Sequence, residues 1–537
     1  MTYDRANHGG EDQRDLERRI TRKQFIGGAA AAGAFFAAPG LLAACGKAST
    51  TSNSTALGSP RKGGRLRVAM VSGGATEMLD PNACVANIDA ARARSLFSTL
   101  TYLKPDQSLE MWLADSFEPN ADATEWTVRL REGPTWSDGT PLVADDLIWT
   151  LNRIASPTGW FFGASVVASI DLKAMRKLDK RTVRMPLKQP IAEFPMQFWT
   201  HQMSVVKNGQ ASFKKPITMG PFRYVSFTPG QSSVFTRNPD YWVPSVPYVD
   251  ELELISISDP GARLGALLGG QVDAIDQLTY EQAKSQGSGG SIQVLNGKGS
   301  NMVPIYMAVD LDPFKDVRVR QAMRLIADRP QLIASAQQGF GEVGNDLYGK
   351  GLLNYDDQLP QREQDIEQAK SLLAAAGQAD LKVALYTSQV APGMLESATV
   401  FAQQAKAAGV TISVNKEPTD SYFGVKYLKQ NFAQTQWLTI PIYSQYAQCL
   451  APGAPYGETH WNDPAWTALW ADATAELDPA KRKDKYFALQ KILYDDGGYL
   501  VWGFYPSLDG LANNVHGVIP DPTNELADFQ FQTWWLS

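Results

Sequence analysis

The sequence predicts an α/β protein with more than one lobe. Short segments in which apolar and polar residues alternate, as in strands, recur along the chain and are separated by segments with apolar residues at helical spacing. This mixture runs from one end of the chain to the other, which is typical of an α/β architecture rather than an all-α or all-β one. The chain has 537 residues. That is more than one hydrophobic core usually serves, so we expect two or three lobes.

The first half of the globular part shows these elements in order. Residues 65–70 (RLRVAM) alternate and predict a strand, whereas residues 90–100 have a helical pattern. Residues 124–130 (TEWTVRL) predict another strand. We expect a turn at residues 138–141 (DGTP), because glycine permits a positive φ there and proline fixes the next step. Residues 144–154 (ADDLIWTLNRI) predict a helix, and its two early aspartates suit the positive end of the helix dipole.

The second half continues the mixture. Residues 222–227 (FRYVSF) and 251–255 (ELELI) predict strands, and residues 263–269 and 316–328 predict amphipathic helices. The charged residues that we expect to form structural ion pairs and helix caps are Asp316, Arg318, Arg320, Asp328 and Arg329. The aromatic residues that we expect to pack inside the lobes are Trp126, Trp136, Tyr241 and Trp242.

Charge and motif content argue against several classes of protein. The net charge is only −6 and no extended basic face is present, so we expect no nucleic-acid partner. A serine hydrolase is unsupported, because no Gly-x-Ser-x-Gly motif occurs. The histidines are isolated and no Cys-x-x-Cys pair occurs, so we expect neither a metal site nor a cofactor. The four histidines are His8, His201, His460 and His516.

The N-terminus has the features of an export signal. A basic block at residues 18–23 precedes an uncharged stretch at residues 25–44, which predicts a signal peptide over residues 1–44. The stretch ends in Leu-Ala-Ala-Cys at residues 42–45, which resembles a bacterial lipobox and predicts lipidation of Cys45; an ordinary cleavage site beside an incidental cysteine is the alternative. Residues 45–60, rich in Ser, Thr and Ala, then form a flexible tether.

This signal predicts where the protein works. Residues 21–26 (TRKQFI) also resemble a twin-arginine signal, but Lys23 stands where the second arginine belongs, so the general secretory route and the twin-arginine route both remain open. In either case we expect a protein in the periplasm or on the outer face of the cell membrane, anchored by lipid.

Two further cysteines remain in the exported chain. Cys84 and Cys449 lie far apart in the sequence, and an oxidising compartment allows a disulfide between them. Two separate buried thiols are the alternative.

Seven motifs in order carry a family resemblance. They are WTVRLREG at residues 126–133, WSDGTPL at 136–142, ADDL at 144–147, GPF at 220–222, NPDYW at 238–242, GQVD at 270–273, and PFKDVRVRQA at 313–322 with Asp328-Arg329 after it. Together they resemble the bacterial extracellular solute-binding proteins of family 5, the group that binds peptides, dipeptides and nickel. The resemblance spans almost the whole exported chain.

The resemblance implies a periplasmic-binding-protein-like fold of the large class II type, with two hinged α/β lobes and an extra subdomain inserted in the first. The first lobe comprises residues 61–95, 216–299 and 505–537, the inserted subdomain residues 96–215, and the second lobe residues 300–504.

The resemblance also implies a cleft between the lobes that closes on a small solute. The ligand-binding residues that it indicates are Val85, Trp160, Phe161, Met302, Trp437, Tyr443 and Tyr446. Peptide-binding members usually carry an aspartate three residues after the tryptophan, where Ile440 stands here. Because isoleucine cannot pair with a charged amine, recognition of a peptide N-terminus needs another acid, and a neutral solute is the alternative. His460 near the cleft mouth is more simply a surface or capping residue.

The function that follows is that of an extracytoplasmic substrate-binding lipoprotein. We expect it to bind a peptide-like or other organic solute as a monomer and to pass it to the permease subunits of an ABC importer. A scavenger of haem or metal complexes is the second hypothesis, and a secreted hydrolase is the third.

Overall fold

A computed structural model describes residues 59–537, apart from residues 158–160, 162, 288 and 420. The predicted signal peptide, Cys45, nearly all of the tether and Trp160 therefore lie outside the described residues. None of the described helices combines the length and the apolar composition that a membrane crossing needs.

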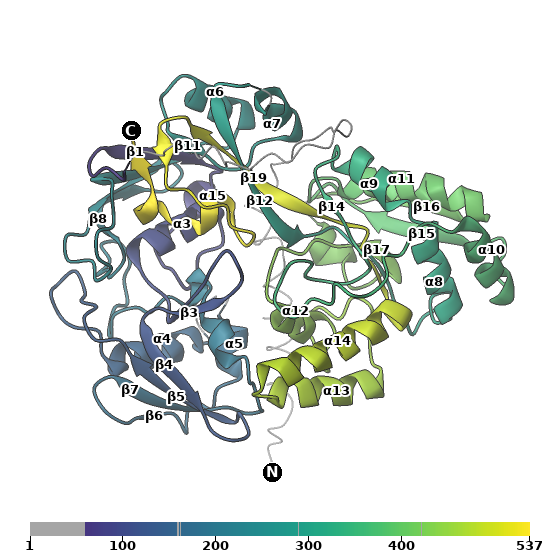
Figure 1. The fold of residues 1–537 in the computed structure, drawn as a ribbon, viewed down its shortest axis with the longest axis horizontal. Coiled ribbons are helices and arrows are strands. Elements are labelled where there is room, and N and C mark those ends of the chain that lie inside the picture. The colour runs from purple at the N-terminus through teal and green to yellow at the C-terminus, as the bar shows by residue number, and fades with distance from the viewer. Residues whose placement is uncertain (1–58, 158–160, 162, 288, 420) are drawn as a thin grey trace, which may run out of the picture.

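The largest sheet has eight strands and belongs to the first of two lobes (Figure 1). Its order is β12-β19-β11-β1-β10-β9-β8, and β14 pairs with β19 beside this path. The strand β1 lies in the middle and runs parallel to both β10 and β11, and its Leu66, Val68 and Met70 are fully buried. The strands are β1 (Arg65–Met70), β8 (Phe222–Thr228), β9 (Ser232–Arg237), β10 (Glu251–Ser256), β11 (Ala274–Ile275), β12 (Ile292–Asn301), β14 (Glu342–Val343) and β19 (Gly503–Ala512). The helices beside them are α3 (Asn87–Leu96), α6 (Pro260–Leu268), α7 (Tyr280–Gln286) and α15 (Glu525–Asp528).

A four-stranded antiparallel sheet forms a separate layer in the same half of the molecule (Figure 1). Its order is β4-β5-β7-β6. Trp126 and Trp136 are buried here, and their indole N–H groups donate to Ile191 O and Asp146 Oδ2, both at 3.1 Å. These two tryptophans pack the lobe as predicted. The elements are β4 (Ala114–Pro119), β5 (Glu125–Leu130), α4 (Ala144–Ile154), α5 (Ala164–Ala168), β6 (Arg176–Lys177) and β7 (Thr182–Pro186).

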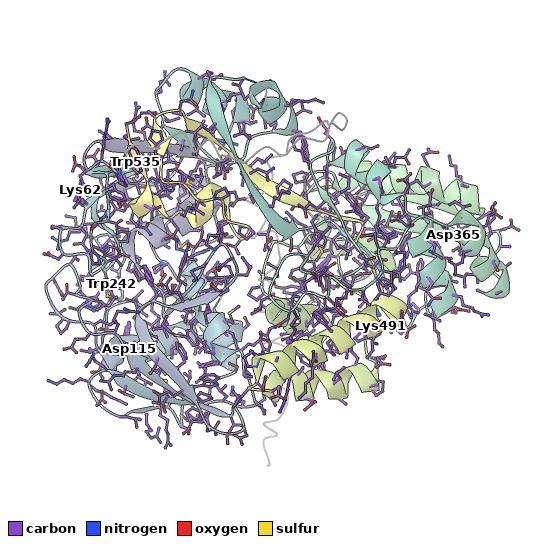
Figure 2. All side chains as sticks on the ribbon, viewed as in Figure 1. Lys62, Asp115, Trp242, Asp365, Lys491 and Trp535 are labelled. Carbon is purple, nitrogen blue, oxygen red and sulfur yellow. The ribbon has the colours of Figure 1, made fainter. Side chains whose placement is uncertain are left out.

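A five-stranded sheet of order β16-β15-β17-β13-β18 forms the second lobe. Its strands are β13 (Ile305–Met307), β15 (Lys382–Thr387), β16 (Thr411–Lys416), β17 (Phe432–Gln434) and β18 (Tyr499–Leu500). Its helices are α8 (Val317–Ile326), α9 (Arg329–Ala336), α10 (Ile366–Ala375), α11 (Met394–Ala405), α12 (Ile442–Cys449), α13 (Pro464–Ala475) and α14 (Pro479–Asp496). Figure 2 labels Asp365 and Lys491 on this lobe and Asp115 and Trp242 on the other.

Short elements complete the chain. They are η1 (Gly74–Thr76), β2 (Thr101–Leu103), β3 (Leu109–Met111), η2 (Phe194–Phe198), η3 (His201–Met203), η4 (Lys406–Ala408), η5 (Tyr422–Lys426), β20 (Val515–His516), η6 (Phe531–Thr533) and β21 (Trp535–Leu536).

The strands β12 and β19 connect the two lobes. They pair antiparallel from Ile292 opposite Ala512 to Asn301 opposite Tyr505, with an irregularity between Gly297 and Asn301. The chain enters the second sheet at β13, directly after β12, and it leaves that sheet at β18, directly before β19. Two adjacent crossings of this kind can act as a hinge, and they confirm the predicted two-lobe α/β class.

A second contact between the lobes lies away from this hinge. Ala192 N donates to Thr474 O at 2.7 Å. The neighbouring Glu193 carboxylate accepts from Tyr486 Oη at 2.5 Å and from Asn354 Nδ2 at 3.3 Å. Because Thr474, Tyr486 and Asn354 belong to the second lobe, these bonds hold the four-stranded-sheet region against it. Any opening of the two lobes at this edge has to break them.

The charged residues near α8 have the structural roles that the sequence predicts. The Asp316 side chain caps α8 by accepting from Arg318 N at 2.9 Å, and Asp328 caps α9 by accepting from Gln331 N at 2.9 Å. The guanidinium of Arg320 donates to the carbonyls of Phe314 at 2.7 Å and Asp496 at 2.6 Å. These residues therefore hold helices and loops in place.

The disulfide that the sequence allows between Cys84 and Cys449 is not formed. Cys84 is buried before α3 in the first lobe, where its Sγ donates to Pro81 O at 3.2 Å. Cys449 is buried at the end of α12 in the second lobe, and Gln445 Nε2 donates to its Sγ at 3.3 Å. Each thiol is enclosed within its own lobe, so the structure has the alternative arrangement of two separate buried thiols.

Candidate functional site

Met302 and Trp437 are neighbours at the edge of the second sheet. Met302 N donates to Trp437 O at 2.9 Å, and Trp437 N donates to Met302 O at 3.0 Å. Thr439 N then donates to Asn301 Oδ1 at 2.8 Å. The segment that carries Trp437 thus runs antiparallel to the end of β12, where the chain passes between the lobes. Two predicted ligand residues are brought together next to the hinge.

A buried carboxylate fixes the Trp437 ring. The indole Nε1 donates to Glu458 Oε2 at 3.1 Å, and Glu458 is fully buried at 0% exposure. The hydroxyls of Tyr427 and Tyr499 also donate to Glu458. Three hydrogen-bond donors satisfy this buried carboxylate. The carboxylate in turn fixes the orientation of the Trp437 ring through the indole N–H. Glu458 was not among the predicted residues, and a single acid in a turn-rich segment gives no sequence signal for this role.

The two tyrosines of α12 differ in their surroundings. Tyr443 stacks on Trp470, with ring centroids 5.4 Å apart, and is largely buried but keeps 9% exposure. Tyr446 is fully buried between Tyr348, Trp466 and other rings. The prediction that Tyr446 contacts a ligand is therefore corrected: its position three residues along the helix turns it into the core of the second lobe.

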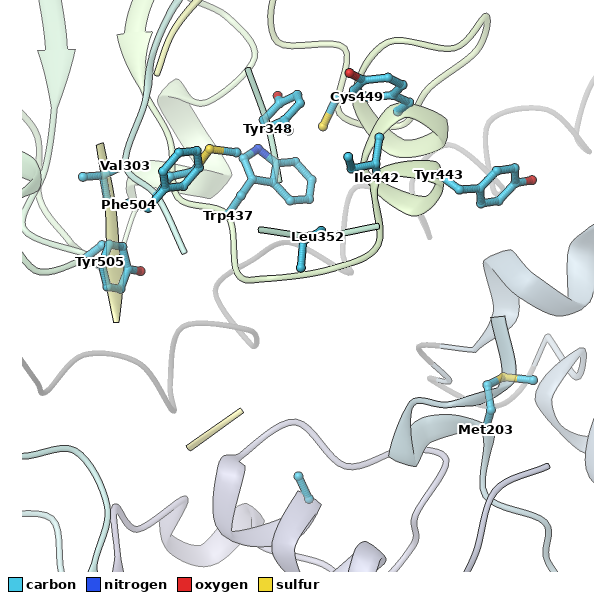
Figure 3. Packing of buried hydrophobic residues seen from close by; sticks show 14 of the residues in the cluster. Met203, Val303, Tyr348, Leu352, Trp437, Ile442, Tyr443, Cys449, Phe504 and Tyr505 are labelled. Carbon is cyan, nitrogen blue, oxygen red and sulfur yellow. The ribbon is translucent and has the colours of Figure 1, made fainter. Parts of the chain in front are cut away.

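Figure 3 shows this face of the second lobe from close by. Trp437, Leu352, Ile442 and Tyr443 lie close together on the second lobe, and Met203 lies across from them in the other half of the molecule. Met203 belongs to η3, which follows the contact at Glu193 in the chain. Leu352, Trp437 and Tyr443 each keep a small exposed fraction, so this side of the second lobe is apolar and aromatic, as small-molecule sites commonly are.

The predicted residues of the first lobe occupy two loops. Val85 is half-buried just before α3. Phe161 is 9% exposed and lies under the guanidinium of Arg153, 4.6 Å from the ring centroid. Arg153 in turn donates to Asn82 Oδ1 at 2.6 Å and pairs with Asp80, so one side chain joins both loops. Trp160 lies outside the described residues.

A pocket of about 330 Å³ lies at the hinge. Its walls come from β12, from a loop of the second lobe, and from two loops on the first-lobe side, one at Pro105 and one near the C-terminus. Its lining residues are Pro105, Asn296, Lys298, Gly299, Lys350, Gly351, Leu352, Pro520, Asp521 and Pro522. Since Leu352 also lies beside Trp437 in Figure 3, the pocket adjoins the space between the lobes. None of its lining residues was predicted, because their proximity depends on how the C-terminal segment returns to β12.

The C-terminal segment next to this pocket is strained and acidic. Four consecutive residues, Leu526 to Phe529, have left-handed φ values between 47° and 57°, which costs about 1–2 kcal/mol per non-glycine residue. The Asp509 carboxylate holds the turn by accepting from Leu526 N at 2.6 Å, and Arg94 pairs with Asp528 at 2.9 Å. Strain of this kind persists only where the surroundings impose it, and it is common at binding sites.

Burial changes the protonation of the carboxyls in this segment. Burial first, and then the nearby Asp528 charge, raise the pKa of Asp521 to about 6. Burial also raises the pKa of Glu525 and of Asp528 above the ordinary range. Arg94 is the nearby cation that opposes these shifts at Asp521 and Asp528. The first-lobe side of the hinge pocket is therefore an acidic environment with one buried guanidinium.

A second pocket, of about 310 Å³, lies within the second lobe. His460 and Trp461 line it, together with the loop after α12. His460 Nδ1 lies 2.7 Å from Asp310 Oδ1 at the surface. This contact supports the simple reading of His460 as a surface residue. Among the residues that the structure describes, no group of three or more His, Cys, Asp or Glu side chains is arranged to hold a metal ion.

The sequence was then compared with known proteins. Residues 108–452 match the profile described as bacterial extracellular solute-binding proteins, family 5 middle. Heme-binding protein A of Haemophilus influenzae is 26% identical over 366 residues, which are 63% of this chain and 66% of that protein. The glutathione-binding protein GsiB of Escherichia coli K12 is 22% identical over 479 residues, which are 84% of this chain and 92% of that protein.

A solved structure has the same fold. The ABC transporter-associated periplasmic binding protein DppA of Helicobacter pylori, in complex with the peptide STSA, superposes with a TM-score of 0.71 at 19% identity. The superposition covers 89% of this chain and 98% of that one.

Proposed function

Because the chain belongs to the bacterial extracellular solute-binding proteins of family 5, we propose that it captures a small peptide-like or other organic solute between its two lobes and delivers it to an ABC importer. The observation that carries this proposal is the hinge pocket, whose walls come from both lobes. A solute that contacts both lobes favours the closed arrangement by the difference in its affinity for the two states. The action is binding and release, without a chemical reaction.

We propose that the site is lined by residues of both lobes. On the second lobe they are Met302, Trp437 and Tyr443, of which Met302 and Trp437 are paired through their backbones beside the hinge. On the first lobe they are Val85, Phe161 and Trp160, of which Val85 and Phe161 occupy the two loops joined by Arg153. Tyr446 is left out. Mass spectrometry of the solute that is released when the purified protein is denatured identifies the ligand directly.

Replacing Trp437 with alanine is expected to weaken binding of that solute by about tenfold or more, which is about 1.4 kcal/mol. The ring is 6% exposed, lies beside the hinge strand and is oriented by Glu458, so a solute held there would contact an aromatic ring of fixed orientation. Isothermal titration calorimetry measures the affinity. Trp149→Ala on α4 is the matched control, because Trp149 lies in the four-stranded-sheet region and not beside the hinge. Equal affinities of the wild type and Trp437→Ala would remove this ring from the site.

We also propose that Cys45 carries the lipid anchor and that residues 45–60 tether the lobes to the membrane. The support is the Leu-Ala-Ala-Cys sequence at residues 42–45 after an uncharged stretch. Replacing Cys45 with serine is expected to move the protein from the membrane fraction to the soluble exported fraction, and to abolish incorporation of labelled palmitate. Cys84→Ser is the control, because that thiol is buried in the first lobe. Labelled palmitate on the Cys45→Ser protein would contradict the assignment.

A haem or a metal complex is the second candidate solute, favoured by the similarity to Heme-binding protein A. Absorbance of the purified protein near 400 nm after incubation with haemin distinguishes it. Saturable binding of haemin that Trp437→Ala weakens would favour this candidate over a peptide.

A further inference from the structure

The segment from Pro520 to Pro522 is held tightly against the hinge strand β12. A Cβ atom on Gly297 would lie only 2.5 Å from Asp521 O, and one on Gly299 only 2.2 Å from Pro522 O. Both glycines therefore allow the segment to approach the strand backbone to backbone. This close packing fixes Asp521 at the wall of the hinge pocket, where it is a lining residue.

One oxygen of the Asp521 carboxylate has a partner and the other does not. Oδ1 accepts from Thr523 N at 2.8 Å and from the Thr523 hydroxyl. Oδ2 is buried without a hydrogen-bond donor among the described residues, and the whole side chain is only 2% exposed. Most buried polar atoms in proteins have a partner, and an unpaired buried carboxylate oxygen is unfavourable. We therefore expect Asp521 Oδ2 to accept a hydrogen bond from a bound solute.

The two lysines of the pocket lining are engaged elsewhere, whereas the charge of Arg94 acts on Asp521 as well as on Asp528. Lys298 Nζ pairs with Glu342 at 2.9 Å, and Lys350 Nζ donates to Val343 O at 2.9 Å. Arg94 pairs with Asp528. A second acceptor of the lining, Asn296 Oδ1, is also buried without a donor. Two oxygen atoms of the pocket lining, Asp521 Oδ2 and Asn296 Oδ1, thus lack a hydrogen-bond donor in the described part of the chain. A solute with N–H groups can supply these donors.

We propose that Asp521 is a specificity-determining residue that binds a protonated amine of the solute through Oδ2, in the pocket between β12 and the segment Pro520–Pro522. The inference rests on the proposed function and names the chemical class of its ligand as small ammonium-bearing solutes. A cation suits this position better than a hydroxyl, because Oδ2 belongs to a buried carboxylate and has no donor within the described chain, and the nearby Asp528 adds negative charge. With a pKa of about 6, Asp521 is mostly ionised at neutral pH.

The test measures binding of defined compounds in matched pairs by thermal shift and by calorimetry. The amines are trialanine, reduced glutathione and putrescine, each beside a form in which every amine is acetylated, and maltose supplies hydroxyl groups without an amine. We expect at least one amine to bind the wild type, with its N-acetylated form about tenfold to a hundredfold weaker. Asp521→Asn is expected to lose this discrimination, whereas Asp484→Asn, at an exposed position on α14, keeps it.

The outcomes separate the inference from the proposed function. Equal binding of an amine and its N-acetylated form to the wild type overturns the role of Asp521 and leaves solute binding intact. Binding of maltose alone does the same. Retained discrimination by a folded Asp521→Asn protein also overturns it. Binding of none of the compounds counts against both proposals. If Asp521→Asn fails to fold, the comparison of each amine with its acetylated form on the wild type still tests whether the site binds an amine.

Discussion

Replacing Glu458 with alanine is expected to lower the free energy of unfolding by about 3–5 kcal/mol, the usual effect of removing one partner from a buried charged network. The Trp437 indole and the hydroxyls of Tyr427 and Tyr499 all donate to this carboxylate. In the alanine variant these three groups have no acceptor inside the core, which is unfavourable. The Trp437 ring also loses the bond that orients it. We therefore expect solute affinity to fall by about tenfold or more in the molecules that remain folded.

The variant Glu458→Gln tests whether the negative charge of Glu458 is needed, or only an acceptor that orients the Trp437 ring. Glutamine keeps the size of the side chain and one acceptor oxygen, so we expect an intermediate loss of both stability and affinity. Urea unfolding gives the stability, and calorimetry on the folded fraction gives the affinity. Glu363→Ala is the control, since Glu363 is exposed in a loop of the same lobe and its change is expected to stay within about 0.5 kcal/mol. Wild-type stability of Glu458→Ala would show that the carboxylate does not hold this cluster.

The second large effect is expected at Asp346. Its carboxylate accepts two bonds from Arg329 Nη2, at 2.9 Å and 2.8 Å, and also pairs with Arg362. Burial acts to raise the pKa of Asp346, but the guanidinium groups of Arg329 and Arg362 outweigh it and lower the pKa. Asp346→Ala leaves two guanidinium groups without their anion, and Arg329 is almost fully buried, so we expect a loss of about 3–5 kcal/mol.

The variant Asp346→Asn removes the charge of Asp346 but keeps a residue type that suits its left-handed backbone conformation. Asp346 has a φ of 61°, which asparagine adopts at lower cost than alanine. We expect the asparagine variant to lose less stability than the alanine variant. The folded-state pKa is lowered, so the contribution of the charge is present above the ordinary aspartate pKa of about 3.9 and is lost as the pH falls below it. The difference between wild type and Asp346→Asn in urea unfolding should therefore shrink below about pH 4. A difference that grows with acid would contradict the ionised state of Asp346.

Much of the local structure could be predicted from the sequence. The alternation at residues 65–70 and 251–255 predicts β1 and β10 within one residue, and the pattern at residues 144–154 predicts α4. These elements have one apolar face or one apolar stripe, which periodicity reveals. The helix predicted at residues 90–100 instead begins at Asn87 and ends at Leu96. The carbonyl of Leu96 accepts from Gly220 N, a contact far away in the sequence that no local pattern shows.

The site could be predicted only in part. The pairing of Met302 with Trp437 brings two predicted residues together, whereas Tyr446 turns into the core because helix α12 presents only some of its faces to the space between the lobes. Glu458 and Asp521 were missed for a common reason. Each is a single acid in a segment without periodicity, and its surroundings come from other parts of the chain: the rings of Tyr427, Trp437 and Tyr499 around Glu458, and β12 beside Asp521.

The central claim is that a solute bound between the lobes holds them together. Release then requires the hinge at β12 and β19 to open and the contacts of Glu193 with Tyr486 and Asn354 to break. Small-angle X-ray scattering of the chain, stripped of solute and then saturated with the solute identified by mass spectrometry, measures this directly. We predict a smaller radius of gyration in the saturated sample. The same radius in both samples, at a solute concentration that calorimetry shows to be saturating, would contradict the account.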